Sequence, residues 1–157
     1  MSKHHEMQGI IRWYKDRTGK IEVTMPDVVA FAVRNGYPLP APIDPLERLA
    51  REFARAAREE IRKDTRTGQP YRVNHAYTTK QGSDQITFWI DIDEAPRGPM
   101  HKCLVQRREQ MVGDALQLTL DADHWNSINL HEEPIQMPLD FAPDVDWRKH
   151  GPDEEAS

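Results

Sequence analysis

The sequence predicts an α+β fold in which a small antiparallel sheet is packed by helices. Three patterns indicate this fold. Apolar residues alternate strictly over 85–92, as in a half-buried strand. They recur with a period of about 3.6 residues over 45–63, as in an amphipathic helix. A longer helical pattern follows over 100–124.

Chain length and composition suggest a single domain. At 157 residues the chain can bury one core but is short for two. We expect a disordered N-terminus over 1–9, one domain over 10–130, and an acidic, partly extended tail over 131–157. The mean hydropathy of −0.79 and the 12 prolines predict a small core with much irregular chain.

The expected sheet combines N-terminal strands with a hairpin. Residues 10–14 and 21–24 read as short strands around a turn that ends at Gly19. The hairpin spans about 71–92, with its turn at 80–84. In its second arm the apolar residues are two apart, which buries one face: Ile86, Phe88, Ile90 and Ile92.

Three helices are expected to pack on this sheet. The first spans about 25–35, with Thr24 as its N-cap. The second, over 45–63, begins at the N-cap Asp44 with proline in its first position. The third spans about 100–124. The order helix, helix, hairpin also admits a winged helix-turn-helix, although the proline-rich connection 37–44 is longer than that motif normally has.

A row of arginines is the feature most suggestive of function. On the 45–63 helix they recur at 3-4-3-4 spacing, opposite the apolar stripe: Arg48, Arg51, Arg55, Arg58 and Arg62. Arg66 and Arg72 follow shortly after. Such a surface could bind the backbone of a nucleic acid or, if the chain is an adaptor, an acidic partner protein. The alternative is a solvent-facing helix side stabilised by pairs four residues apart, such as Glu47 with Arg51.

The net charge of −5 does not exclude a phosphate-bearing partner, because the charge is unevenly distributed. Residues 131–157 carry eight acidic and two basic side chains, which leaves about +1 for 1–130. The stretch 45–80 holds nine basic and five acidic residues. The acidic tail either competes with phosphate for the basic surface or keeps the protein soluble.

Other classes of protein are disfavoured. The lone cysteine, Cys103, fits a reducing compartment, and no apolar run is long enough for a membrane span. We therefore expect a cytoplasmic protein with no membrane partner. We identify no catalytic residue, cofactor or metal site. The one enzymatic alternative is a metal-dependent phosphodiesterase that uses Asp91 and Asp93, two carboxylates on one side of a strand end.

The tail contains a second binding candidate. Residues 136–141 read Gln-Met-Pro-Leu-Asp-Phe. This segment resembles the short peptides with which bacterial replication and repair proteins dock on the sliding clamp, which pair a glutamine with hydrophobic residues a few positions later. The matching positions would be Gln136, Met137, Leu139 and Phe141, and the resemblance implies an adaptor. The alternating apolar residues also fit a strand that completes the domain sheet, which is the reading we favour.

Overall fold

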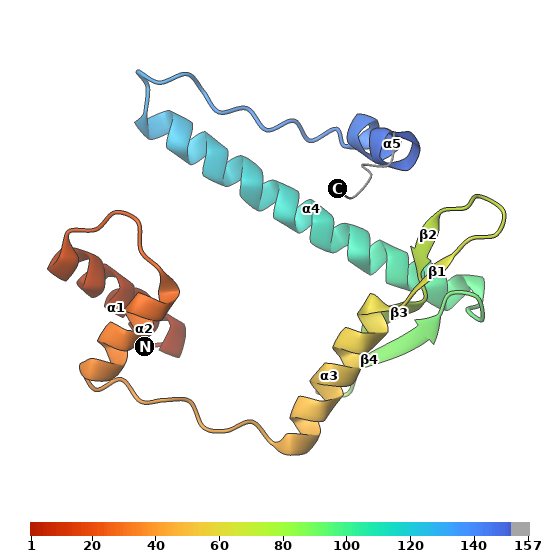
Figure 1. Ribbon diagram of the computed structural model, residues 1–157, viewed down its shortest axis with the longest axis horizontal. Helices are drawn as coiled ribbons and strands as arrows, with labels where there is room; N and C mark the ends of the chain where they lie inside the picture. The colour runs from red at the N-terminus through yellow and green to blue at the C-terminus, as the bar shows by residue number, and fades with distance from the viewer. Residues whose placement is uncertain (152–157) are drawn as a thin grey trace, which may run out of the picture. The chain divides into compact units, whose positions relative to one another are not determined.

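The computed structural model, described over residues 1–151, has an α+β fold, as the sequence predicts (Figure 1). Its contacts divide the chain into two compact units, Met1–Arg48 and Leu49–Ser157, which we call unit 1 and unit 2. The domain boundaries inferred from the sequence stay predictions.

Unit 1 contains a helix pair where strands were expected. Helix α1 spans Lys3–Thr18 and α2 spans Met25–Arg34. The Ser2 hydroxyl accepts a hydrogen bond from His5 N, and Gly19, with φ of 68°, ends α1 in the left-handed conformation. The predicted strands at 10–14 and 21–24 are therefore wrong, whereas the helix expected at 25–35 is confirmed. The disorder expected for 1–9 stays a prediction.

Aromatic contacts hold the two helices of unit 1 together. Phe31 of α2 packs edge-on against Trp13 and Tyr14 of α1, with ring centroids 4.8 and 5.4 Å apart. Tyr14, Val28 and Ala32 are buried. This small core explains why the 10–14 run is helical: its aromatic residues face one neighbouring helix rather than a sheet.

Helix α3 spans Pro45–Glu59 and is shorter than predicted. Its start matches the sequence prediction, since the Asp44 carboxylate accepts a hydrogen bond from Leu46 N at 3.4 Å. The chain then leaves the helix and forms strand β1, Ile61–Lys63, which pairs antiparallel with β2, Pro70–Arg72. The expected helix over 60–63 is wrong because residues 61–63 form backbone hydrogen bonds with residues 70–72, which follow a turn at Gly68.

The predicted hairpin is confirmed. Strand β3, Asn74–Gln81, pairs antiparallel with β4, Asp84–Asp91. Thr78 lies opposite Thr87, and their hydroxyl oxygens are 3.0 Å apart. This hairpin and the β1–β2 pair are two separate sheets within residues 1–151.

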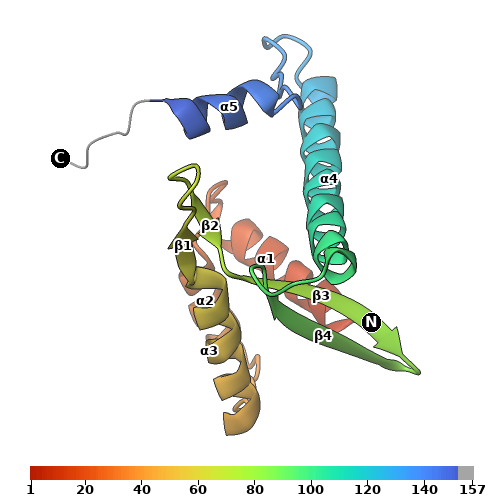
Figure 2. The same ribbon diagram turned by 90° about the vertical axis from the view of Figure 1, so that its right-hand side faces the viewer.

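Helix α4 spans Arg97–Ile128, somewhat longer than the predicted 100–124, and its N-terminal part lies beside β3 (Figure 2). The Gln106 side chain fixes this contact. Its Oε1 accepts from Thr78 N and its Nε2 donates to Thr78 O, both at 2.8 Å. One glutamine thus bonds to the edge of β3 as a neighbouring strand would.

After α4 the chain runs back along that helix without forming a strand, so the predicted sheet-completing strand over 135–141 is wrong (Figure 1). Asn126 exchanges two hydrogen bonds with the backbone of Ile135, at 2.8 and 2.9 Å. Helix α5, Ala142–His150, was not expected. Gln69 donates to Lys149 O at 2.9 Å and so joins α5 to the β1–β2 pair.

The core of unit 2 lies where β3 meets α4. Val73 and Cys103 are the most deeply buried side chains of the described chain, and His75 is its buried polar residue. His75 Nε2 donates to Arg72 O at 2.8 Å. Within residues 1–151 no helix combines the length and apolarity needed to cross a membrane. The winged helix-turn-helix alternative depends on how α2 and α3 pack together, and it stays a prediction.

Candidate functional site

A groove in unit 2 gathers side chains from α3, both hairpins and α4. We call it the basic groove. Its volume is about 490 Å³. Its charged and aromatic lining consists of Arg58, Arg72, His75, Trp89, Arg107 and Asp114. Three guanidinium groups therefore share the groove with one carboxylate.

Arg58 reaches the groove from the last turn of α3. Its guanidinium carbon lies 5.2 Å from the centroid of the Trp89 ring, which projects from β4. A cation over an aromatic face is attracted by the ring quadrupole. This contact orients Arg58 without neutralising it, so its charge remains available to a ligand.

Arg72 and Arg107 enter from other elements. Arg72 ends β2, and Arg107 lies one turn after Cys103 on α4. Arg107 is half-buried, whereas Arg72 is exposed. Among residues 1–151 no carboxylate lies within 4 Å of either guanidinium. A half-buried guanidinium without a carboxylate partner favours an anionic ligand.

Hydrogen bonds join the elements that line the groove. Asn74 donates to Ala57 O at 3.1 Å and to the Glu60 carboxylate at 2.9 Å, which joins β3 to the end of α3. The Gln106 side chain makes two hydrogen bonds with the backbone of Thr78, which join α4 to β3. Burial raises the pKa of the Cys103 thiol, so this residue packs as a neutral apolar group.

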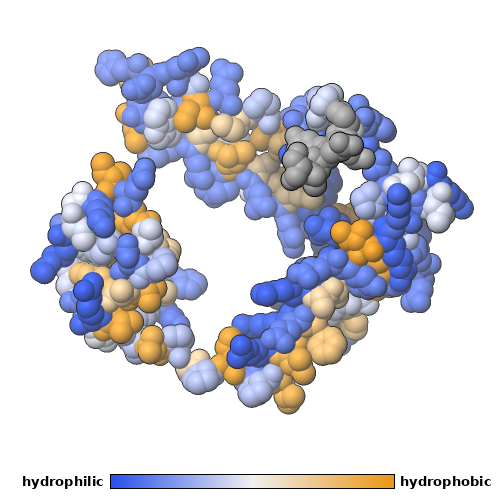
Figure 3. Space-filling view, in the orientation of Figure 1, coloured by the Kyte–Doolittle hydropathy of each residue, from blue (hydrophilic) through white to orange (hydrophobic). Residues whose placement is uncertain are grey.

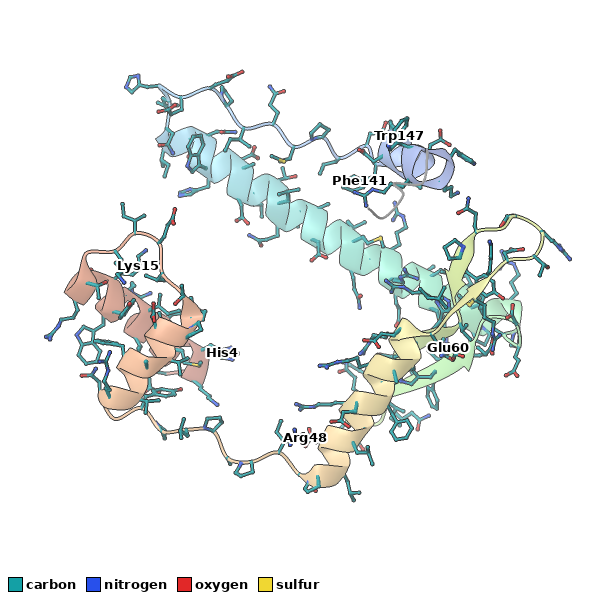
Figure 4. All side chains as sticks on the ribbon, in the orientation of Figure 1. His4, Lys15, Arg48, Glu60, Phe141 and Trp147 are labelled. Atoms are coloured by element: carbon teal, nitrogen blue, oxygen red, sulfur yellow. The ribbon has the colours of Figure 1, made fainter. Side chains whose placement is uncertain are left out.

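The arginine row of the sequence is only partly continuous in the structure. Figure 4 marks Arg48 near the start of α3 and Glu60 just beyond its end. Because α3 repeats every 3.6 residues or so, its four arginines share one side. They are Arg48, Arg51, Arg55 and Arg58. The space-filling view shows hydrophilic and hydrophobic surface on different sides of this helix (Figure 3). Of the four, only Arg58 lines the basic groove.

Arg62 does not continue the row, because it lies in β1 and binds two carboxylates. Its guanidinium nitrogens are 3.2 Å from Asp91 Oδ2 and 2.6 Å from Asp93 Oδ2. Tyr71 donates its hydroxyl to the same Asp93 oxygen at 2.9 Å. We call these four residues the carboxylate cluster.

Hydrogen bonding shifts the acidity of this cluster. The Tyr71 hydroxyl and the Arg62 guanidinium hold the pKa of Asp93 below its ordinary value of 3.8. The pKa of Arg62 is raised, chiefly by its bond to Asp93, and the pKa of Tyr71 is raised by the same carboxylate. In the folded state the cluster thus pairs the Arg62 guanidinium with two carboxylates, which leaves one negative charge in excess.

The remaining sequence candidates lie elsewhere. Arg66 follows β1 and lines a separate cavity of about 480 Å³ together with Lys63 and Asp93. Asp91 and Asp93, proposed as metal ligands, are the partners of Arg62. Within the described part of the chain, no three His, Cys, Asp or Glu side chains are grouped as a metal would need.

The predicted docking peptide lies in the extended chain between α4 and α5 (Figure 4 marks Phe141). Met137, Leu139 and Phe141 are each about half exposed, at 50, 45 and 50%. Gln136 is exposed. The acidic residues of the predicted tail beyond Gly151 lie outside the described residues.

Sequence reasoning missed the contributions of Trp89, Arg107 and Gln106. A signal for Arg107 existed, since Cys103, Arg107, Gln110 and Asp114 recur at helical spacing and form one side of α4. No pattern within the helix sequence itself predicted that this side of α4 faces β3. Comparison of the chain with protein-family models, curated proteins and solved structures found no match.

Proposed function

We propose that the protein is a nucleic-acid-binding module that holds the phosphate backbone in the basic groove. The observation that carries this proposal is the convergence of Arg58, Arg72 and Arg107 from α3, β2 and α4 on one groove. Arginine binds phosphate in a bidentate manner and carries its charge at every physiological pH.

The groove supports this function better than the arginine row alone. A row on one exposed helix is also what a well-paired solvent face looks like. The fold brings the three groove arginines together from distant parts of the chain. Their like charges repel at close range, so pairing along one helix does not explain their arrangement. A phosphate would offset that repulsion.

The test compares two variants that lose the same charge. In the groove variant, Arg58, Arg72 and Arg107 are changed to Gln. In the control, Arg12, Arg17 and Arg34 of unit 1 are changed to Gln; all three are exposed. Fluorescence anisotropy with a labelled oligonucleotide should show binding by the wild-type protein and the control and at least a tenfold loss in the groove variant.

Two results would contradict the proposal. One is absence of oligonucleotide binding by the wild-type protein at low salt, where phosphate contacts are strongest. The other is an equal loss of oligonucleotide affinity in both triple variants, which would mean that only the net charge of the protein matters. Displacement of the oligonucleotide by an equal charge of polyaspartate would favour an acidic protein partner instead.

We propose docking on a bacterial sliding clamp as a second candidate function. It is supported by the half-exposed side chains of Met137, Leu139 and Phe141 in a segment that belongs to no helix or strand. Changing Leu139 and Phe141 to Ala should abolish co-elution with a purified clamp. Changing Val145 and Trp147 of α5 to Ala is the control, since these residues are comparably exposed. Failure of the wild-type protein to co-elute would end this candidate.

A further inference from the structure

We infer that the basic groove takes single-stranded nucleic acid in preference to duplex, with an unpaired base stacked on the Arg58–Trp89 pair. This inference rests on the proposed function and specifies its ligand. Three properties of the groove carry it: its concave form, its exposed aromatic ring and its single carboxylate.

The groove is small in comparison with a duplex. Its volume of about 490 Å³ lies in the usual range of small-ligand sites, about 300–1,000 Å³. Duplex readers instead project a helix or ribbon into a major groove about 12 Å wide. A flexible single strand can place one nucleotide into a recess, whereas a stacked pair of strands keeps its bases inside the helix.

Trp89 offers a stacking surface next to the arginines. Its side chain is 37% exposed and lines the groove, beside the guanidinium of Arg58. Proteins that bind single strands stack unpaired bases on aromatic rings or on guanidinium planes. In a duplex the faces of the bases are covered by the neighbouring base pairs. The Arg58–Trp89 pair can therefore stack only on a base of an unpaired strand.

The carboxylate of Asp114 points to the same ligand. It lies seven residues after Arg107, two helical turns further along α4, and lines the same groove. A carboxylate repels phosphate but accepts hydrogen bonds from the amino groups of bases. We assign the arginines to the backbone and the region of Asp114 to base edges. Gln110, between them on α4, can donate to either.

The test uses the full-length protein and three labelled probes of the same mixed base sequence and equal length: a DNA strand, an RNA strand and a DNA duplex. Anisotropy at one salt concentration should show at least tenfold tighter binding of a single strand than of the duplex. Comparison of the DNA strand with the RNA strand then separates DNA from RNA. Duplex binding that is equal or tighter overturns the inference while leaving the proposed function intact.

Trp89 variants test the stacking step separately. Trp89→Ala should weaken single-strand binding about tenfold and duplex binding much less, whereas Trp89→Phe should retain most of the affinity. Trp147→Ala is the matched control, since Trp147 is 68% exposed and does not line the groove. Equal affinity of Trp89→Ala and wild type, with unchanged circular dichroism, overturns the stacking assignment. Absence of binding by all three probes overturns the proposed function as well.

Discussion

Arg58 and Arg62 are four residues apart, yet the structure places them in opposite chemical surroundings. Arg58 lies over an aromatic ring at the edge of the basic groove. Arg62 lies between two carboxylates in the carboxylate cluster. The difference arises because α3 ends at Glu59 and the next residues enter a strand.

This contrast shows that charge alone does not define a binding residue. Arg62 donates hydrogen bonds to Asp91 and Asp93 and so joins β1 to the end of β4. Arg58, Arg72 and Arg107 contact no such partner within the described residues, so their charge can serve a ligand. The two sites lie in one unit and can be changed independently, which makes the contrast testable.

The largest effect is expected from Gln106, which holds the α4 wall of the groove against β3. Gln106→Ala removes two hydrogen bonds to Thr78 and should lower the free energy of unfolding by about 1–3 kcal/mol. It should also weaken oligonucleotide binding, because Arg107 loses its position. Urea denaturation measures the first effect. Gln110→Ala, one turn further on, is the control and should leave the free energy of unfolding unchanged.

A smaller effect separates the two arginines directly. Arg58→Gln should reduce oligonucleotide affinity about tenfold and leave the melting temperature nearly unchanged. Arg62→Gln should lower the melting temperature, since two carboxylates lose their cation, and leave the affinity unchanged. Anisotropy and calorimetry on both variants check this. The same change in affinity for both would mean that the two arginines are equivalent.

The smallest effect concerns pH. The pKa of Asp93 is lowered in the folded protein, so its ionised form is favoured by folding. The resulting stability is present above its ordinary pKa of 3.8 and is lost as pH falls through the lowered folded value. The melting temperature of Asp93→Asn should therefore fall below that of wild type at pH 7, and the gap should close as pH drops below 4. A gap that is constant with pH would contradict the cluster.

The sequence predicted what depends on local chemistry. The alternation of Ile86, Phe88 and Ile90 placed the β3–β4 hairpin, and Asp44 marked the start of α3. The N-terminal strands failed because an aromatic-rich run suits either a strand or a helix that packs on another helix. Gly19, read there as part of a turn, is the C-terminal cap of α1.

What depends on distant partners could not be predicted. The end of α3 is decided by pairing of 61–63 with 70–72, which competes with helical continuation. The groove needs α4 to lie on the β3 edge, an arrangement held by contacts between residues far apart in the sequence, such as the two hydrogen bonds of Gln106 with Thr78. Four of the seven arginines proposed from the sequence share a side of α3, and two of the seven line the groove: Arg58 and Arg72.

The most direct test is the salt dependence of oligonucleotide affinity in wild type and in the groove variant lacking Arg58, Arg72 and Arg107. Each phosphate neutralised on a single strand contributes about −0.7 to the slope of log affinity against log salt. The three arginines should therefore give the wild-type protein a slope of about −2 or steeper. The groove variant should have a slope shallower by about 2. Equal slopes in the two proteins would contradict phosphate binding in the groove.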